Sequence, residues 1–111
     1  SLHKTGRIIS HLHGQKADHL DEVLDPLKGK PIYLSIDLDW FDPSVMPGTG
    51  TPEPGGYFWQ DFSAIMNVLR KHHLVGADVV ELAPQLDPSK ISSILAAKVV
   101  RSMLLLLNID Y

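Results

Sequence analysis

Two carboxylates, one residue apart, end an apolar stretch of the chain. Asp37 and Asp39 close the segment YLSIDLD, which begins at Tyr33. On a strand, their side chains would lie on one face and repel each other. A divalent cation bound between them would relieve the repulsion, and a site built only from oxygen atoms favours Mg²⁺, Mn²⁺ or Ca²⁺. A third acid, Glu81, follows a second apolar run and could join the pair if the two runs form neighbouring strands.

Each of these acids also has a simpler interpretation. An Asp-x-Asp pair often only solvates a strand end or forms an Asx turn, and a lone glutamate is usually exposed or ion-paired. Asp42, directly before Pro43, is typical of a turn residue rather than a ligand. His11 and His13 alternate as they would on a strand and could bind a metal, but no acid lies beside them until Asp18.

The elements that must position the acids begin with a helix and a strand. Apolar residues recur with helical spacing after Asp18, which suits an N-cap, and Gly29 ends the run. From Pro31 to Asp39 the apolar residues alternate with polar ones. This alternation predicts a strand with one apolar face and with Asp37 and Asp39 on the other face.

A long loop and a second helix follow. Residues 40–56 are rich in proline and glycine, which predicts an ordered loop, and loops of this length are usually functional or disordered. Helical spacing then runs from Phe58 to Leu69, with Phe58 and Phe62 expected in the core and His72 and His73 as charges at the helix end. Several aromatic residues flank the loop and could either line a pocket or hold the loop in place: Trp40, Phe41, Tyr57 and Trp59.

A second strand and a last helix complete the pattern. Residues 75–82 form a short apolar run that suits a buried strand. Asp87 suits an N-cap and Pro88 the first position of a helix that extends to Leu107. Alternating strands and helices predict an α/β fold with a parallel sheet flanked by helices. Because ligands bind beyond the carboxyl ends of such strands, the three acids are expected at one rim of the sheet.

Length and composition narrow the possible classes of protein. The 111 residues suit one compact domain, in which residues 1–17 are hard to assign although residues 7–10 could form a short strand. A net charge of −3 without a basic stripe argues against nucleic acid as a partner, and the absence of cysteine excludes thiolate metal sites. The most apolar stretch, residues 94–107, is too short to cross a membrane. No signal peptide is visible, so we expect a cytoplasmic protein.

Three segments resemble one known family. SIDLDWFDP at residues 35–43 and PGTGTPEPGG at residues 47–56 closely resemble the ureohydrolases, which comprise arginases, agmatinases and related guanidino-hydrolases. GADVVELAP at residues 76–84 is similar to the family's Asp-x-x-Glu-x-x-Pro segment. The PEPGG residues of the second segment and the ELAP residues of this one resemble the agmatinase branch most. The resemblance covers about residues 18–107. It implies a three-layer α/β/α domain, of which residues 1–111 would be only the C-terminal part.

The resemblance also implies a site and a reaction. Asp37 and Asp39 would be ligands of a binuclear Mn²⁺ centre, with Asp37 bridging the two ions and Asp39 binding one of them. A hydroxide held between the metals would attack the guanidinium carbon of a small guanidino substrate. Glu81 would accept hydrogen bonds from that guanidinium group. For an agmatinase, the reaction would convert agmatine to putrescine and urea.

The chain departs from the family pattern, and this keeps other hypotheses open. Family members carry an earlier Gly-Gly-Asp-His segment and an Asp-x-His-x-Asp segment that complete the metal shell, and neither is present. We therefore expect these residues alone to be inactive. One alternative is a non-catalytic domain that assembles as a homo-oligomer or with a partner, because a partial sheet exposes its edges. Another is an Asp-x-Asp phosphotransferase resembling the haloacid dehalogenase group, although no paired acids near Glu81 would hold its Mg²⁺.

Overall fold

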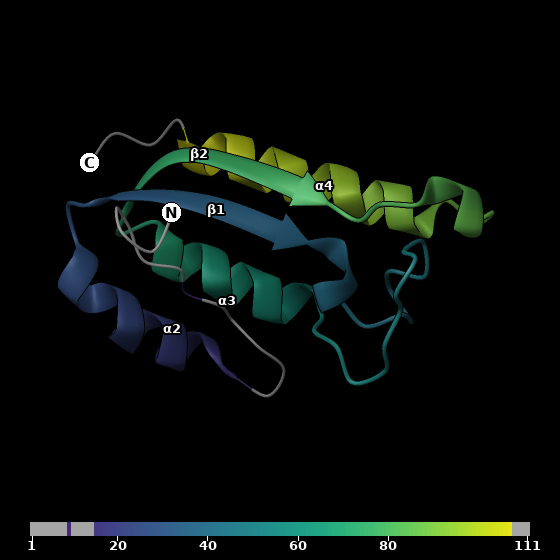
Figure 1. Cartoon of the computed structure of the whole chain (residues 1–111), viewed down its shortest axis with the longest axis horizontal. Coiled ribbons are helices and arrows are strands. Elements are labelled where there is room, and N and C mark those ends of the chain that lie inside the picture. Colours follow the sequence, from purple (N-terminus) through teal and green to yellow (C-terminus); the bar gives the residue numbers. More distant parts are fainter. Residues whose placement is uncertain (1–8, 10–14, 108–111) are drawn as a thin grey trace, which may run out of the picture.

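A computed structural model describes residue 9 and residues 15–107. His11, His13 and most of the possible strand at residues 7–10 lie outside the described residues, so those predictions are not tested. Strands and helices alternate along the rest of the chain (Figure 1). The elements, with three short 3₁₀ turns labelled η, are α2 (Ala17–Leu24), η1 (Asp25–Leu27), β1 (Pro31–Asp37), η2 (Leu38–Trp40), α3 (Trp59–Leu69), β2 (His73–Val80), η3 (Pro84–Leu86) and α4 (Ile91–Leu107).

The two strands form a parallel pair, as the sequence predicts. The register runs from Pro31 opposite His73 to Asp37 opposite Val80. Helix α3 makes the connection between the strands, and α4 follows β2. Because the strands are parallel, their carboxyl ends lie at the same end of the sheet, beside the long loop (Figure 1). The prediction of an α/β fold with a parallel sheet flanked by helices is confirmed.

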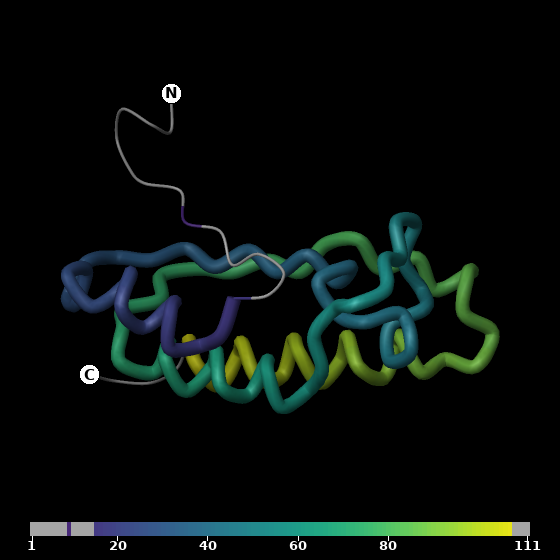
Figure 2. Tube along the Cα trace, turned by 90° about the horizontal axis from the view of Figure 1, so that it is seen from below, coloured from purple at the N-terminus to yellow at the C-terminus, as the bar shows by residue number. Residues whose placement is uncertain are grey.

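Helices α2, α3 and α4 lie on one side of the sheet (Figure 2). The core forms between this side of the strands and the helices, and its buried residues include Ile36 and Leu74 from the sheet, Phe62 from α3 and Val99 from α4. The side chains that alternate with the buried ones point away from the helices and are exposed, among them Tyr33 at 61%. The described residues therefore contain the sheet and one helical layer.

A β-bulge interrupts the pairing near the start of β2. Ile32 lies opposite Leu74 but Tyr33 lies opposite Gly76, so Val75 is the extra residue, and its side chain is 57% exposed. An extra residue reverses the alternation of side chains beyond it. For this reason the even-numbered residues that follow the bulge face away from the helices.

A polar cluster covers the middle of this outer face. The ring of Tyr33 lies across Gly76, where a Cβ atom would be 2.9 Å from Tyr33 Cε2. The hydroxyl of Tyr33 donates to Asp78 Oδ2 at 2.9 Å, and Ser35 Oγ donates to Asp78 Oδ1 at 2.6 Å. The hydrogen bond to Asp78 raises the pKa of Tyr33. Side-chain bonds thus tie the two strands together in addition to their backbone pairing.

Several predicted boundaries at the helix starts are wrong. Helix α2 begins at Ala17 with Lys16 in the N-cap position, so Asp18 lies in the first turn and is not the cap. Helix α4 begins at Ile91 rather than at Pro88, because Lys90 has a left-handed backbone with φ of 67°. The Asp87 side chain still accepts a hydrogen bond from a backbone N–H in the first turn of α4, although Asp87 lies further upstream than a standard N-cap.

The carboxylate of Asp87 collects hydrogen bonds at that start. Its Oδ2 accepts the N–H of Ser92 at 2.8 Å, and its Oδ1 accepts both the hydroxyl and the N–H of Ser89. The Ser89 hydroxyl, followed by the donors of Ser92, lowers the pKa of Asp87 to about 2. The sequence thus correctly predicts that Asp87 caps the start of α4 but places the first residue of the helix too early.

Residues near the end of α3 also differ from expectation. Strand β2 begins at His73, two residues earlier than predicted, and ends at Val80. His72 is not an exposed charge at the helix end: its side chain is only 4% exposed, and neither ring nitrogen has a hydrogen-bond partner. Burial lowers the pKa of His72, because a charged imidazolium loses hydration there. Phe62 is buried as predicted, but Phe58 is 44% exposed because it precedes the helix.

No helix within residues 15–107 is both long enough and apolar enough to cross a membrane.

Candidate functional site at the carboxyl end of the sheet

Asp37 and Asp39 lie where strand β1 turns away from the sheet. Asp37 is the last residue of the strand, whereas Asp39 lies in η2 and not on the strand as predicted. The N–H of Asp39 donates to Asp37 Oδ1 at 3.2 Å, so the Asp37 side chain caps the turn. This short turn, rather than strand alternation, keeps the two carboxylates together.

The electrostatics of Asp37 reflect its acidic neighbours. Desolvation of its carboxylate is the largest cause of a raised pKa, although the residue as a whole is exposed. The carboxyl group of Asp39 raises the pKa of Asp37 further, and so does the charge of Glu81. Asp37 pairs with Val80, the residue before Glu81, so the three predicted site residues lie at the same rim of the sheet, and we refer to Asp37, Asp39 and Glu81 as the rim acids.

Glu81 has an unusual backbone at the end of β2. It is the first residue after the strand, and its φ of 75° lies in the left-handed region. Residues other than glycine rarely adopt this region, and strained backbones of this kind concentrate at functional sites. The turn it makes ends the strand and leaves the Glu81 side chain exposed at the rim.

Asp42 closes the base of the long loop. Its Oδ1 accepts the N–H groups of Gly55 and Gly56 at 3.1 and 3.2 Å, while its Oδ2 accepts from Ser44, which forms an Asx turn. The donors of Ser44, and then those of the two glycines, lower the pKa of Asp42. A Cβ atom at Gly56 would lie 2.6 Å from the backbone nitrogen of Asp42, so only glycine fits this closure. Asp42 is thus a turn residue, as expected from the sequence.

Aromatic rings hold the same base. Trp40 stacks on Tyr57 with ring centroids 4.2 Å apart, and Phe41, which is 1% exposed, packs against Phe62 at 5.8 Å. Trp59 packs against Phe62 at 5.1 Å. These rings pin the loop to the core, which is one of the two roles that the sequence left open.

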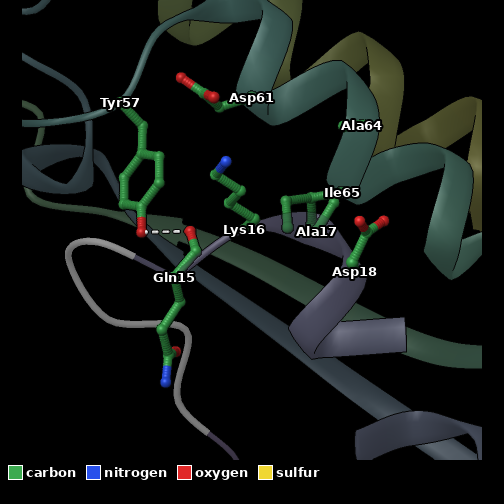
Figure 3. A pocket seen from close by; sticks show the side chains of 8 residues that line it. All are labelled: Gln15, Lys16, Ala17, Asp18, Tyr57, Asp61, Ala64 and Ile65. Atoms are coloured by element: carbon green, nitrogen blue, oxygen red, sulfur yellow. Dashed lines mark hydrogen bonds between the residues drawn. The ribbon is translucent and has the colours of Figure 1, made fainter. Parts of the chain in front are cut away.

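A separate hollow lies between the start of α2 and α3. It has a volume of about 280 Å³, and Tyr57 forms one wall with its hydroxyl donating to the Gln15 carbonyl at 2.7 Å (Figure 3). Lys16 and Asp61 also line it. The rim acids do not contribute to this hollow.

Thr51 is a residue of the site that sequence reasoning missed. Its hydroxyl donates to Asp39 Oδ2 at 2.6 Å across the loop. Nothing in the periodicity of the sequence indicates this contact, since Thr51 lies twelve positions beyond Asp39 within an irregular segment. The only available signal was its place in the PGTGTPEPGG segment.

The loop also reaches the segment that carries Glu81. The carbonyl of Gly48 accepts the N–H of Ala83 at 2.7 Å, and the N–H of Gly48 donates to Ser92 Oγ at the same distance. A Cβ atom at Gly48 would lie 2.8 Å from Ser92 Cβ, so a larger residue would push the two segments apart. The loop therefore contacts the segments that follow the carboxyl ends of both strands.

The rim acids fit one part of a metal shell. The hydrogen bonds above engage Asp37 Oδ1 and Asp39 Oδ2, which leaves the other oxygen of each carboxylate outside these two bonds. Two repelling carboxylates with such oxygens suit a hard divalent cation. Within residues 15–107 no group of three or more His, Cys, Asp or Glu side chains is arranged to hold a metal ion. A complete shell would thus need ligands beyond those the described residues supply.

Comparisons with known proteins agree on one family. Residues 7–106 match the model of the arginase family. The chain is 45% identical over 91 residues to an agmatinase from Halalkalibacterium halodurans, an alignment that covers 80% of this chain and 32% of that protein. Among solved structures it superimposes on proclavaminate amidino hydrolase from Streptomyces clavuligerus with a TM-score of 0.74 and 33% identity, over 83% of this chain and 31% of that one. For the agmatine ureohydrolase of Thermoplasma volcanium the values are 0.68 and 34%, over 82% and 30%.

The chain spans about a third of the length of the relatives it matches.

Proposed function

The chain belongs to the arginase family, and from this we propose that it is the C-terminal part of a ureohydrolase that converts agmatine to putrescine and urea. The observation that supports the proposal is that Asp37 and Asp39 share one turn at the end of β1 while Glu81 follows the neighbouring end of β2, in a fold that matches the family. In the reaction, water adds to the guanidinium carbon and the bond from that carbon to the amine nitrogen breaks. The amine leaves as putrescine after it gains a proton.

Asp37 and Asp39 would hold manganese in this enzyme. Their side chains share one turn, and the charge of a divalent cation would offset the repulsion that raises the pKa of Asp37. When bound, manganese supplies Lewis acidity that makes water nucleophilic at neutral pH. The two carboxylates provide oxygen ligands only, in keeping with a hard or borderline ion rather than a soft one.

Glu81 would bind and orient the substrate. A guanidinium group carries N–H donors in a planar fork, and a carboxylate can accept two of them at once. The left-handed backbone of Glu81 fixes where the side chain leaves the main chain. A guanidinium held there would lie at the same rim as Asp37, because Glu81 directly follows Val80, the partner of Asp37 in the strand pairing. Such fixed geometry lowers the entropic part of the barrier.

The choice of agmatine rests on the relatives. The H. halodurans protein is an agmatinase, and the S. clavuligerus structure is a proclavaminate amidino hydrolase, so the family accepts more than one guanidino compound. In sequence alignments the identity is 45% to the H. halodurans agmatinase and 38% to the S. clavuligerus proclavaminate amidinohydrolase, which favours the agmatinase branch for this chain. We propose that residues outside this chain select the side chain of the substrate.

A chimera tests the proposed function. The 91 matched residues of the H. halodurans agmatinase would be replaced with the corresponding residues of this chain, and urea release with Mn²⁺ would be assayed on agmatine, arginine and guanidinobutyrate. We expect urea from agmatine. Asp37→Asn and Glu81→Gln in the chimera should each lower the rate at least about 100-fold, more than loss of an outer-shell partner usually costs.

The controls separate folding from chemistry. The 111-residue chain assayed alone should release no urea from any of the three substrates, because its described residues supply only part of a metal shell. A chimera that folds with a native-like circular dichroism spectrum yet hydrolyses no guanidino compound would contradict the proposal. That result would favour the alternative of a non-catalytic domain.

We also propose that the protein is cytoplasmic and self-associates. Ile94 and Leu105 on α4 are 60% and 56% exposed, which is unfavourable for an isolated helix face in water. Light scattering over a dilution series would give the mass of the particle, and a monomer at every concentration would contradict self-association.

A further inference from the structure

One side chain at the amino end of the sheet is buried without a partner. His72 lies in the turn between α3 and β2, its side chain is 4% exposed, and neither Nδ1 nor Nε2 makes a hydrogen bond. Buried polar atoms nearly always have partners, so an imidazole with two unsatisfied nitrogens is an exception that needs a reason. A side chain required only for packing would be less costly there if it were apolar.

The charges around His72 favour its neutral form. The strongest act from its own turn, from α2 and from η1 with its last turn, and they belong to Lys71, Asp21, Asp25 and Lys28. Both carboxylates are already paired: Asp21 Oδ1 accepts from Lys71 Nζ at 2.6 Å. Asp25 Oδ1 lies 2.9 Å from Lys28 Nζ. Burial, followed by the charges of Lys28 and Lys71, lowers the pKa of His72.

A proton on His72 would make the packed arrangement unfavourable. A neutral imidazole carries one donor and one acceptor, whereas an imidazolium carries two donors and a positive charge. A buried charge without a partner costs far more than a buried neutral group. If α2 and η1 move away, water can reach the ring, and the carboxylates of Asp21 and Asp25 become free to change partners.

We propose that His72 is a pH switch that controls the docking of α2 and η1. Its neutral ring permits these two elements to pack against the end of α3, and its protonated ring releases them into solvent.

Helix α2 and η1 are the part of the fold best able to move. Helix α2 packs against α3 at the edge of the helical layer (Figure 1). It has 8 residues, and Lys16 at its N-cap makes no side-chain hydrogen bond, so its stability depends on the packing of Leu20 and Leu24. Gly29, with φ of 81° and open space around it, links η1 to β1 and can act as a hinge. Strand pairing begins only at Pro31, so the sheet would stay intact.

Amide hydrogen exchange of the 111-residue chain, followed by NMR at about pH 7 and about pH 5, tests the switch. Each rate is compared with the unfolded-chain rate at the same pH, which removes the chemical effect of pH on exchange. One proton changes an opening equilibrium by at most about 10-fold per pH unit, so the protection of α2 should fall about 10-fold or more over this range. At the lower pH, α4 should remain at least about 10-fold better protected than α2, because its amides exchange only when the core unfolds.

Three variants separate His72 from its neighbours. His72→Phe keeps an aromatic ring but binds no proton, so the protection of α2 should change less than about 3-fold between the two pH values. His73→Gln is the matched control, because it removes an exposed imidazole one position away. His19→Gln removes the exposed imidazole of α2 itself. Both controls should respond to pH as the wild type does.

A titration of the His72 ring in the wild type, followed by NMR, gives a second measurement that needs no variant. Its midpoint should lie below the ordinary value of 6.5 and coincide with the loss of α2 protection. If His72→Phe fails to fold, this titration decides alone: a midpoint at or above 6.5 would overturn the switch.

Several exchange results would also overturn it. One is a wild-type α2 that is equally protected at both pH values, and another is a loss that persists unchanged in His72→Phe. Equal protection of α2 and α4 at the lower pH would do the same, because α2 would then open only with the whole core. A pH response that disappears in His73→Gln or His19→Gln would assign the switch to another histidine. None of these results depends on metal or substrate, so the test is independent of the proposed function.

Discussion

The two ends of the parallel sheet differ in how their charged side chains are arranged. Before the strands begin, Lys71 pairs with Asp21 at 2.6 Å and Lys28 pairs with Asp25 at 2.9 Å. Where the strands end, the rim acids repel one another, and within residues 15–107 neither ion pair involves them. The amino end thus has compensated charges around a buried imidazole, whereas the carboxyl end has like charges held close by hydrogen bonds of a loop.

This difference separates structural from functional placement. Paired charges need no further partner, and exposed pairs of this kind add little stability. Like charges held together cost stability and persist only when the surrounding structure fixes them. At the rim, that structure is the loop closed by Asp42 and carrying Thr51. The comparison can be tested by changing each end in turn.

The largest effect is expected at the base of the loop. Gly56→Ala places a Cβ atom 2.6 Å from Asp42 N and 2.7 Å from the carbonyl carbon of Phe41, both rigid backbone atoms. We expect a loss of about 1 to 3 kcal/mol in the free energy of unfolding, as for other overpacked sites. Urea denaturation followed by circular dichroism would measure it.

Gly50→Ala in the same loop is the matched control. No atom lies within 4 Å of a Cβ at that position, and its φ is not left-handed. Its free energy of unfolding should stay within about 0.5 kcal/mol of the wild-type value. Equal losses in the two variants would mean that the closed base is not what holds the loop.

A smaller effect, dependent on pH, is expected at the amino end. The pKa of His72 is lowered by burial and by Lys28 and Lys71, with Asp21 and Asp25 acting in the opposite direction. The unfolded chain therefore binds a proton more readily than the folded one. The stability due to neutral His72 is complete above its ordinary pKa of 6.5 and is lost as the pH falls below that value.

His72→Phe should remove this dependence. A single titrating group changes the free energy of unfolding by at most about 1.4 kcal/mol per pH unit. Between about pH 7 and about pH 5, the wild type should therefore lose more stability than the variant. Urea unfolding at several pH values gives both curves. Parallel curves would show that His72 is protonated as easily in the folded chain as in the unfolded one.

The smallest effect is expected from an ion pair at the same end. Lys71→Ala removes the bond to Asp21, whose side chain is 41% exposed, so the free energy of unfolding should fall by less than about 1 kcal/mol. The difference from the wild type should shrink further in 0.5 M salt (about 4 to 5 Å of Debye length). A larger loss of free energy of unfolding that does not shrink in salt would contradict this prediction and show that the pair is important for the stability of the fold.

The sequence allows the fold and the rim acids to be predicted for a clear reason. Alternation from Pro31 and the apolar run before Glu81 are local signals of strands, and parallel strands bring their carboxyl ends together. The position of Asp39 in a turn was missed because the alternation of residue types continues to Leu38 although the strand stops at Asp37.

The remaining features depend on contacts between distant segments. His72 follows two basic residues, so the sequence suggests an exposed helix end, but its own side chain is buried within reach of the charges of Asp21 and Asp25. Thr51 meets Asp39 across a loop whose base is closed by Asp42. Neither contact has a period or a spacing from which it could be predicted.

The bulge at Val75 sets the direction of every side chain in the rest of β2. If Val75 were paired in a regular ladder without the bulge, the strand beyond it would be inverted, so that the charged Asp78 would point into the apolar layer between sheet and helices while Ala77 and Val79 would point out. Deleting Val75 would instead keep the present directions, because Gly76 would still lie opposite Tyr33 and Asp78 opposite Ser35. The extra residue can therefore be lost but cannot be straightened into the ladder of a strand that leads directly to Glu81.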